Sequence, residues 1–445
     1  MFVNAQSTGL SFADAGRIAV EASEDLRHQE AMLALQRDVW KWGRRAYFPK
    51  LSISAYEDDR LDPDGPDSFQ KNYALSLEQL VFDGGRLATS RKIEKAKFAT
   101  RAAGLESAKS DIYEEALGIY RSILLGRETL AIRKRGLDSL EAERRVLAVK
   151  LELGMALPAE FAEFDISIAD SKIAILMSEL ELAETEQQFA EMLGMETLPT
   201  LIEKIDINRK AIHVNTTEVC SAAQARNPEL LSARLAIKEK EEETRLAARS
   251  WLPSIKANGS FIVRGSRYPL TQHTWQAGLT LEFDTPFLSG SSGLNFGYEG
   301  RKTKTARLQG QLTPLSNPAG WPALHEPQLT LSLERSKFEL LFERTGRNVK
   351  IAIERCRFSE EKLLLAKETS RLAEARFALV KVKYDLGQLT GIELLDAQTE
   401  RIQKEIALAE AAAQLLAEER ALEKLMDLRP GELLSFSKDT QKNQS

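Results

Sequence analysis

Two turns of similar sequence separate long stretches of helical periodicity, and this repetition constrains the fold most. One turn lies within residues 383–398, where Gly387 would end a helix and Thr390-Gly391 would turn the chain. A shift of 233 residues aligns an earlier turn with it, and the residue pairs are Gly154 with Gly387, Glu160 with Glu393, and Glu163 with Asp396. Two such tips predict two copies of a long helical hairpin.

A second repetition, at a shift of 204 residues, extends the duplication beyond the hairpins. Residues 11–47 and 215–250 are each predicted to form one helix, and the first opens with the capping pair Ser11 and Asp14. Both helices end in a basic residue, an aromatic residue and a proline, in that order. The chain is therefore interpreted as two structural repeats, residues 1–214 and 215–445.

After each of these prolines the pattern changes from helical to alternating, which is typical of β-strands. The predicted strands are residues 50–57 and 72–83 in the first repeat, and 253–263 and 274–284 in the second. Aromatic residues flank them, and their length fits the roughly 9–11 residues of a membrane barrel strand. Soluble sheets show the same alternation, so it does not choose between lipid and water.

The longest proline-free stretches carry apolar residues seven apart, as helices that pack in coiled coils do. Clear examples are Leu105, Ile112 and Ile119, and later Leu408, Leu415 and Leu422. Long hairpins are predicted over 86–193 and 327–426, with a connector at 194–214 and a polar tail at 427–445. Taken alone, the heptads equally fit a soluble coiled-coil interaction or scaffold protein, which is the alternative interpretation.

Composition and residue spacing exclude several functional classes. A net charge of -5 over 445 residues gives no reason to expect nucleic acid. Cys220, Cys356 and four isolated histidines lack metal-ligand spacing, so neither a metal nor a cofactor is predicted. No nucleophile–base or phosphate-loop motif points to an enzyme.

Membrane and targeting segments give two further observations. No apolar run is long enough for a membrane-spanning helix. Residues 3–5 resemble the end of a cleaved signal peptide.

Several motifs resemble those of the outer-membrane efflux protein family, the TolC-like exit ducts. They are Phe82-Asp-Gly-Gly85, Asn227-Pro-Glu-Leu230, Trp251-Leu-Pro253, and Tyr384-Asp-Leu-Gly387 followed by Glu393-Leu-Leu-Asp-Ala397. In the first motif, Phe82, Asp83, Gly84 and Gly85 would form a strand-to-helix junction. The resemblance includes the twice-repeated order of helix, strand pair and long hairpin, and so covers nearly the whole chain.

The resemblance implies a mainly α protein with membrane β-structure, in which a periplasmic α-barrel joins an outer-membrane β-barrel. The connector and the tail at 427–445 would form an equatorial collar. The resemblance also implies that three copies of the chain assemble into a homotrimer. This homotrimer would be the passive exit duct of a tripartite efflux or type I secretion system. Its partners would be outer-membrane lipid, a periplasmic adaptor protein and, indirectly, an inner-membrane transporter. A trimer also has a physical reason, because two strand pairs cannot close a barrel and lipid does not tolerate open strand edges.

One segment departs from the family pattern. The shifts of 204 and 233 differ by 29 residues, which lie around 285–326, between the second strand pair and its hairpin. Two short alternating runs about a Gly-Arg-Lys turn suggest an additional hairpin there. The family's four strands per protomer would then become six, and the trimeric barrel would have 18 strands instead of 12. A surface or collar insertion fits the sequence equally well.

Four residues near the second tip match the family's gate by position. Glu393 and Asp396 share one helix face and match carboxylates at the aperture, and Tyr384 matches an aromatic that helps hold the closed state. Three copies would gather six carboxylates, which attract cations. Leu389 stands where some relatives have a basic gate residue, so closure would rest on packing. The alternative for the two acids is an ordinary solvated helix face.

The two turns also have a predicted docking role. As the resemblance implies, apolar and backbone groups of the tips would contact a periplasmic adaptor, namely those of Leu153, Gly154, Leu157, Pro158, Leu386 and Gly387. Plain turn chemistry would explain the same residues without any partner. Adaptor binding is therefore the property that distinguishes the two interpretations.

Overall fold

The computed structural model describes residues 9–60, 68–154, 157–209, 215–285, 287–299, 303–316 and 320–433. The chain divides into two compact units. The first comprises Met1–Gln29, Leu105–Leu230 and Leu341–Ser445, and the second comprises Glu30–Gly104 and Leu231–Leu340. The predicted signal-peptide remnant and the tail beyond residue 433 lie outside the described residues.

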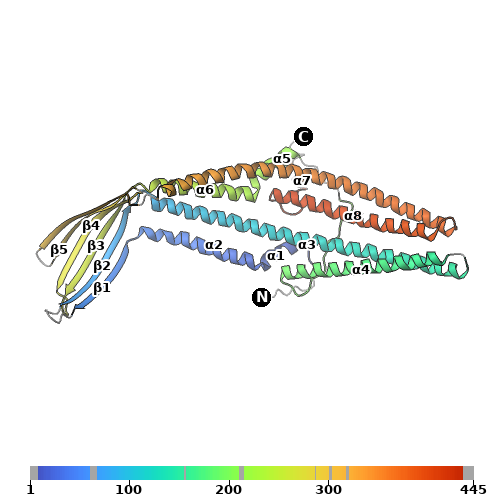
Figure 1. Cartoon of the computed structure of the whole chain (residues 1–445), viewed down its shortest axis with the longest axis horizontal. Coiled ribbons are helices and arrows are strands. Elements are labelled where there is room, and N and C mark those ends of the chain that lie inside the picture. The colour runs from blue at the N-terminus through green and yellow to red at the C-terminus, as the bar shows by residue number, and fades with distance from the viewer. Residues whose placement is uncertain are drawn as a thin grey trace. The chain divides into compact units, whose positions relative to one another are not determined.

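Helices dominate the described chain, as Figure 1 shows. Their bounds are α1 Phe12–Ala22, α2 Glu24–Trp42, α3 Arg86–Glu152, α4 Pro158–Leu193, α5 Thr216–Arg226, α6 Pro228–Arg249, α7 Gly320–Asp385 and α8 Gly391–Leu425. A short 3-10 helix, Gly43–Tyr47, follows α2. Within the described residues, none of the helices is both long enough and apolar enough to cross a membrane.

The strands that the structure describes form one antiparallel sheet in the order β1-β2-β3-β4-β5-β6. Their bounds are β1 Lys50–Arg60, β2 Ser68–Phe82, β3 Ser254–Gly265, β4 Gln272–Asp284, β5 Leu288–Glu299 and β6 Thr303–Pro314. β5 pairs with β4 along its whole length, and β6 pairs with β5. Residues 288–314 therefore extend the sheet by one hairpin, in the segment for which the sequence left two interpretations open.

The first two strands are longer than the alternating pattern predicts. Residues 58–60 have polar side chains and lie beyond the predicted strand, yet Arg60 pairs with Ser68. Backbone hydrogen bonds between strands do not depend on side-chain polarity, so pairing continues past the apolar part of the pattern.

Two predicted helices are each broken into two by an internal capping residue. The helix expected over 11–47 ends at Ala22, and Ser23 Oγ accepts a hydrogen bond from the Leu26 N–H at 3.3 Å. The helix expected over 215–250 breaks at Asn227, whose Oδ1 accepts from the Leu230 N–H at 3.1 Å. The first N–H groups of a helix have no carbonyl partner within that helix, and these short polar side chains accept hydrogen bonds from them. The two breaks are again 204 residues apart.

The second long hairpin begins earlier than predicted. α7 starts at Gly320 and continues through Pro327, which is the first residue of the predicted hairpin. The carbonyl of Pro327 accepts a hydrogen bond from Thr244 Oγ1 of α6 at 3.2 Å. A proline inside a helix is unfavourable by local propensity alone. At Pro327 the helix also makes this hydrogen bond to the neighbouring helix α6.

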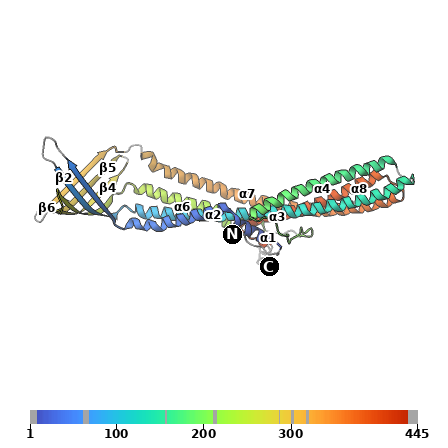
Figure 2. The same cartoon turned by 90° about the horizontal axis from the view of Figure 1, so that it is seen from below.

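The first unit has both buried clusters between helices and exposed apolar seams along them. Its described residues form four apolar clusters, each with side chains from different helices. Figure 2 shows α3, α4 and α8 running together. One exposed seam on α7 has a seven-residue step and comprises Ile351, Phe358, Leu365, Leu372 and Leu379. A second seam on α4 comprises Ile166, Ile173 and Leu180. Seams with this step are typical of helices that pack against another helix.

Candidate functional site

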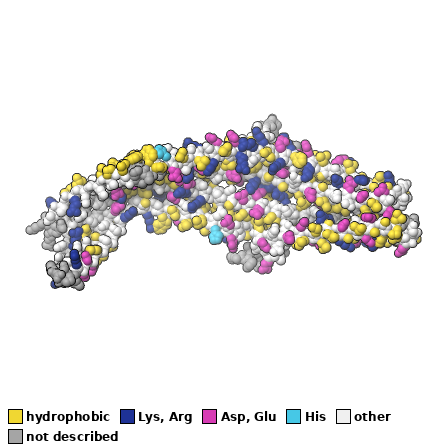
Figure 3. All heavy atoms as spheres, in the orientation of Figure 1, with side chains coloured by type: hydrophobic (Ala, Val, Ile, Leu, Met, Phe, Trp, Pro, Cys, Tyr) yellow, Lys and Arg dark blue, Asp and Glu magenta, His cyan; other side chains and the backbone are white. Residues whose placement is uncertain are grey.

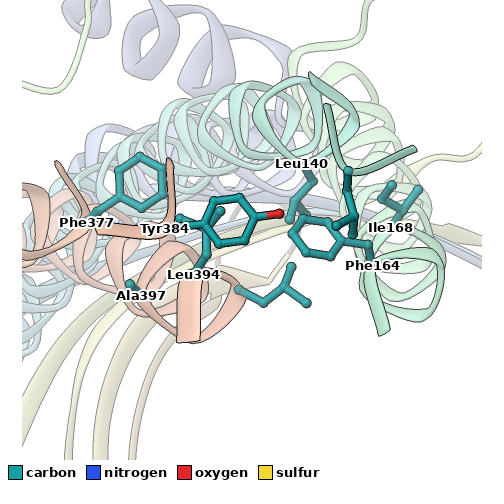
Figure 4. Close-up of a cluster of buried hydrophobic side chains, with 9 residues drawn as sticks. Leu140, Phe164, Ile168, Phe377, Tyr384, Leu394 and Ala397 are labelled. Carbon is teal, nitrogen blue, oxygen red and sulfur yellow. The ribbon is translucent and has the colours of Figure 1, made fainter. Parts of the chain in front are cut away.

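The two predicted tips meet in one group of buried side chains, the tip cluster, which Figure 4 shows. Its members are Leu140 and Leu147 of α3, Phe164 and Ile168 of α4, Phe377 and Tyr384 of α7, and Leu394, Leu395 and Ala397 of α8. All four long helices contribute to this cluster. The hairpin of α3 and α4 and the hairpin of α7 and α8 therefore share one core.

Tyr384, predicted as a gate residue, is buried in the tip cluster with 5% of its surface exposed. In Figure 4 its ring lies between Leu394 of its own hairpin and Phe164 of the other. The Lys150 ammonium lies 4.0 Å from the ring centroid, within the range of a cation–π contact. The hydroxyl has no hydrogen-bond partner among the described residues, and burial raises the pKa of Tyr384. Packing, not a hydrogen bond, therefore holds this side chain.

Both turns use a glycine in the left-handed conformation. Gly154 has φ 69° and Gly387 has φ 73°, values that side chains with a Cβ rarely adopt. After Gly387, the Gln388 N–H donates to the Lys383 carbonyl at 2.9 Å, which closes the end of α7. These two glycines are needed for the backbone geometry of the tips.

Glu393, predicted at the aperture, forms the capping box that starts α8. Its Oε2 accepts a hydrogen bond from the Thr390 N–H at 2.8 Å, and Thr390 Oγ1 accepts from the Glu393 N–H at 3.5 Å. The backbone bond from Thr390, followed by the side-chain bond, lowers the pKa of Glu393. The first hairpin has no counterpart, because Leu157 precedes α4 and Pro158 is its first residue.

The other two predicted gate residues lie outside the tip cluster. Asp396 is exposed on α8, one turn after the capping box. Leu389 is half-buried in the turn that precedes Thr390. The structure thus buries Tyr384 and leaves both carboxylates, Glu393 and Asp396, at the surface of the tip.

Polar contacts also join the two hairpins close to their tips. Glu160 Oε1 of α4 accepts a hydrogen bond from the Gly391 N–H at the start of α8, at 3.4 Å. A Cβ on Gly391 would lie 3.2 Å from the Phe164 ring, so this position is tightly packed. Farther along, the Lys381 ammonium lies 2.5 Å from the carboxylate of Glu143, which links α7 to α3. Separation of the hairpins would break all of these contacts.

Large apolar side chains are exposed at both turns. Leu153, Leu157 and Leu386 are 68%, 64% and 68% exposed, and all three were predicted as docking residues. Pro158 and the two turn glycines, also predicted there, lie beside them in the chain. Exposed leucines thus lie at both turns, where the docking residues are predicted.

The predicted strand-to-helix junction has a defined capping geometry. Asp83 Oδ1 accepts a hydrogen bond from the Gly85 N–H at 2.8 Å, and its other oxygen accepts from the Leu87 N–H at 2.5 Å. Gly84 and Gly85 have φ 67° and 77°. A Cβ on Gly84 would lie 2.5 Å from the Leu252 Cβ, so glycine is needed for both backbone and packing reasons. Phe82 ends β2 and is exposed.

Sequence reasoning missed several residues that hold the tip together. Phe164 and Leu394 pack on Tyr384, and their apolar spacing could have indicated a shared core. The Thr390 capping box also has a local signature, Thr followed three residues later by Glu. By contrast, buried Gln398 donates to the Gly136 carbonyl at 3.0 Å, across 262 residues, and no local signal reveals that bond.

Comparison with known protein families and sequences finds partial similarity to outer-membrane efflux proteins. Residues 17–195 match the model of the outer membrane efflux protein family. The outer membrane efflux protein BepC of Brucella suis is 20% identical over 244 residues, which are 54% of this chain and 52% of that protein. The match thus spans about half the length of this relative.

Solved structures resemble the chain over nearly its whole length. A structure of CusC, described as forming a transmembrane channel, has a TM-score of 0.77 at 12% identity and matches 96% of this chain and 95% of that one. The open state of the MtrE outer membrane channel of Neisseria gonorrhoeae has a TM-score of 0.73 at 15% identity, over 94% and 89% of the two chains. VceC of Vibrio cholerae has a TM-score of 0.74 at 10% identity, over 93% and 95%. These likenesses establish the fold.

Proposed function

We infer that this chain, whose residues 17–195 belong to the outer membrane efflux protein family, is a protomer of a passive exit duct in the outer membrane. The duct would serve a tripartite efflux or type I secretion system and would open at its periplasmic tip. The observation that carries this proposal is the full-length likeness in fold to outer membrane channels such as MtrE. Within the described residues, no group of histidine, cysteine and acidic side chains could hold a metal ion.

A homotrimer is proposed as the working state. The apolar seams on α4 and α7 are exposed in the single chain, and packing one seam against the other seam of the next copy would bury both. Such head-to-tail contacts close into a ring when the rotation per copy fits. The element order also repeats within the chain, which supports an internal duplication. Each protomer would then contribute two similar helical hairpins to the ring.

The six-stranded sheet supports a membrane barrel shared by three copies. β1 and β6 each pair on one side only, so the sheet has two open edges within one chain. Lipid does not tolerate unpaired strand edges, and pairing β6 with β1 of the next copy would remove them. Three copies of the six-stranded sheet would give a barrel of eighteen strands. The exposed leucines and isoleucine of the edge strands, Leu51, Ile53, Leu308 and Leu312, suit a lipid-facing surface.

Conductance of the purified protein in planar lipid bilayers tests this function. Discrete conducting steps, a requirement for detergent and cross-linking into a trimer are the expected results. A protein that stays monomeric without detergent and conducts no ions would instead support the alternative, a soluble coiled-coil scaffold.

Neutralising the tip carboxylates should reduce the preference of the channel for cations. The variant Glu393→Gln/Asp396→Asn removes two charges per chain, and a glutamine still completes the capping box. The expected result is a several-fold lower cation-to-anion permeability ratio and weaker block by divalent cations, because rings of carboxylates select cations. Reversal potentials in asymmetric salt measure the ratio.

A matched control removes the same charge from the other hairpin. Glu152 and Glu163 are exposed on α3 and α4, so Glu152→Gln/Glu163→Gln changes the net charge equally. Unchanged selectivity in this control, with reduced selectivity in the first variant, assigns the aperture to α8. Equal effects of the two variants would refute that assignment.

Polar substitutions at the tip leucines should weaken binding of a periplasmic adaptor. Leu153→Ser/Leu157→Ser/Leu386→Ser removes three exposed apolar side chains without disturbing the turn glycines. Each buried leucine contributes about 1.5–3 kcal/mol, so at least a tenfold loss of adaptor recovery after cross-linking is expected. Ile202→Ser, at a residue 59% exposed outside the tips, is the control and should bind normally. Full adaptor recovery with the triple variant would rule out docking at these leucines.

A further inference from the structure

The segment that joins α2 to β1 collects basic side chains without acidic ones. Residues 41–50 contain Lys41, Arg44, Arg45 and Lys50 and neither aspartate nor glutamate. All four residues are exposed. None of them forms an ion pair with a carboxylate of the described residues. We call these four residues the basic segment.

The corresponding segment in the second half of the chain uses its basic residues for the fold. A shift of 204 residues places Arg45 on Arg249, whose Nη1 donates to the Gly85 carbonyl at 2.9 Å. It also places Lys41 on Arg245, which pairs with Glu242 at 2.5 Å. Within the part of the chain that the structure describes, the basic segment has no such hydrogen-bond or ion-pair partners, so its charges are available to a ligand outside the chain.

Aromatic side chains surround the basic segment. Trp42, Tyr47 and Phe48 are 53%, 44% and 66% exposed, and the Arg45 guanidinium carbon lies 3.3 Å from the Trp42 ring centroid. The sheet continues from this point, and β1 exposes Leu51 and Ile53, while Figure 3 shows further hydrophobic side chains exposed along the sheet. Amphipathic aromatic rings beside an apolar surface are typical of the boundary between lipid and water.

The same boundary is marked at the neighbouring strands. Lys50 is the first residue of β1, and the register of the sheet puts the last residues of β4 and the first residues of β5 at the same end. There, the Trp321 ring lies 6.3 Å from Trp251 and 5.3 Å from Phe287. Basic side chains at this level would face lipid headgroups on the side of the sheet that leads to the helices.

We propose that the basic segment binds the phosphate groups of anionic phospholipids in the membrane leaflet nearest the helices. This proposal rests on the proposed function, because it requires the sheet to lie in a membrane. Arginine can bond a phosphate with two parallel N–H donors, and the neighbouring aromatic rings would contact the glycerol and acyl region. Each basic residue near an anionic surface strengthens binding about fivefold, so four give a strong preference for anionic over zwitterionic lipid.

Native mass spectrometry of the detergent-solubilised protein tests the proposal. Phosphatidylglycerol and phosphatidylcholine are titrated separately, and the wild-type chain should bind the former at least about tenfold more tightly. The variant Lys41→Gln/Arg44→Gln/Arg45→Gln/Lys50→Gln should bind both lipids equally. Inorganic phosphate should not displace bound phosphatidylglycerol, because it lacks the parts that the aromatic rings contact. Equal binding of both lipids by the wild type, or displacement by phosphate, would overturn the proposal.

A matched control separates local binding from net charge. Lys337→Gln/Arg347→Gln/Arg357→Gln/Arg371→Gln removes the same charge from exposed ion pairs of α7 and should keep the lipid preference. Loss of the preference in this control would refute a site at the basic segment. Conductance is recorded in parallel. Normal wild-type conductance without lipid preference refutes only this proposal, whereas absence of conductance refutes the proposed duct.

Discussion

Replacing Tyr384 with alanine should loosen the tip and raise the conductance of the closed duct. The side chain is 5% exposed and packs in a cluster built from all four long helices, so its loss leaves a cavity between the two hairpins. Truncating a buried aromatic residue costs about 3–5 kcal/mol of stability. Amide hydrogen exchange in residues 377–400 should therefore accelerate by about a hundredfold or more. The mean current through single channels measures the functional effect.

Tyr384→Phe is the matched control for this prediction. It keeps the ring against Phe164 and Lys150 and removes a hydroxyl that has no hydrogen-bond partner among the described residues. Removing an unsatisfied buried polar group is neutral or stabilising, so exchange and conductance should match the wild type. If the phenylalanine variant opened the duct as the alanine variant does, the hydroxyl and not the packing would hold the gate.

Replacing Arg420 with alanine should destabilise the middle of the first unit by about 3–5 kcal/mol. The Arg420 side chain is 7% exposed, and its Nε lies 2.9 Å from a carboxylate oxygen of Glu114 on α3. Its Nη1 donates to Glu423 at 2.8 Å and to the Leu428 carbonyl at 3.0 Å. The variant leaves the buried carboxylate of Glu423 and the partly buried carboxylate of Glu114 without their cation, which is the costly case. Thermal unfolding followed by circular dichroism measures the loss.

Two comparison variants make this prediction specific. Arg347→Ala breaks an exposed pair with Glu343 and should cost no more than about 1 kcal/mol. Arg420→Met/Glu114→Leu/Glu423→Leu removes the whole buried group and should recover much of the stability, because no charge is left unpaired. A triple variant as unstable as Arg420→Ala would mean that the alanine variant fails through lost packing instead of a buried charge.

Local chemistry accounts for what could be predicted from the sequence. The seven-residue spacing predicts the long helices. The glycines at 154 and 387 predict the two turns, and in the structure both glycines adopt the left-handed conformation. Ser23 and Asn227 break two helices that were predicted as continuous, although both are ordinary capping residues. The Thr390–Glu393 capping box also has a local signature, yet the sequence-based interpretations of Glu393 were an aperture residue or a solvated helix face. Such signals involve residues three or four apart, so they act in any tertiary context.

The sequence by itself determined the periodic helices, the alternating strands and the order in which they repeat, because spacing fixes which side chains share a face. Only the tertiary structure decided which faces meet. It buries Tyr384 against Phe164, joins Arg420 to Glu114 across 306 residues, and adds β5 and β6 to the sheet instead of leaving them outside it. Burial and pairing depend on segments far apart in the chain, and a pattern within one segment carries no information about the partner it will contact.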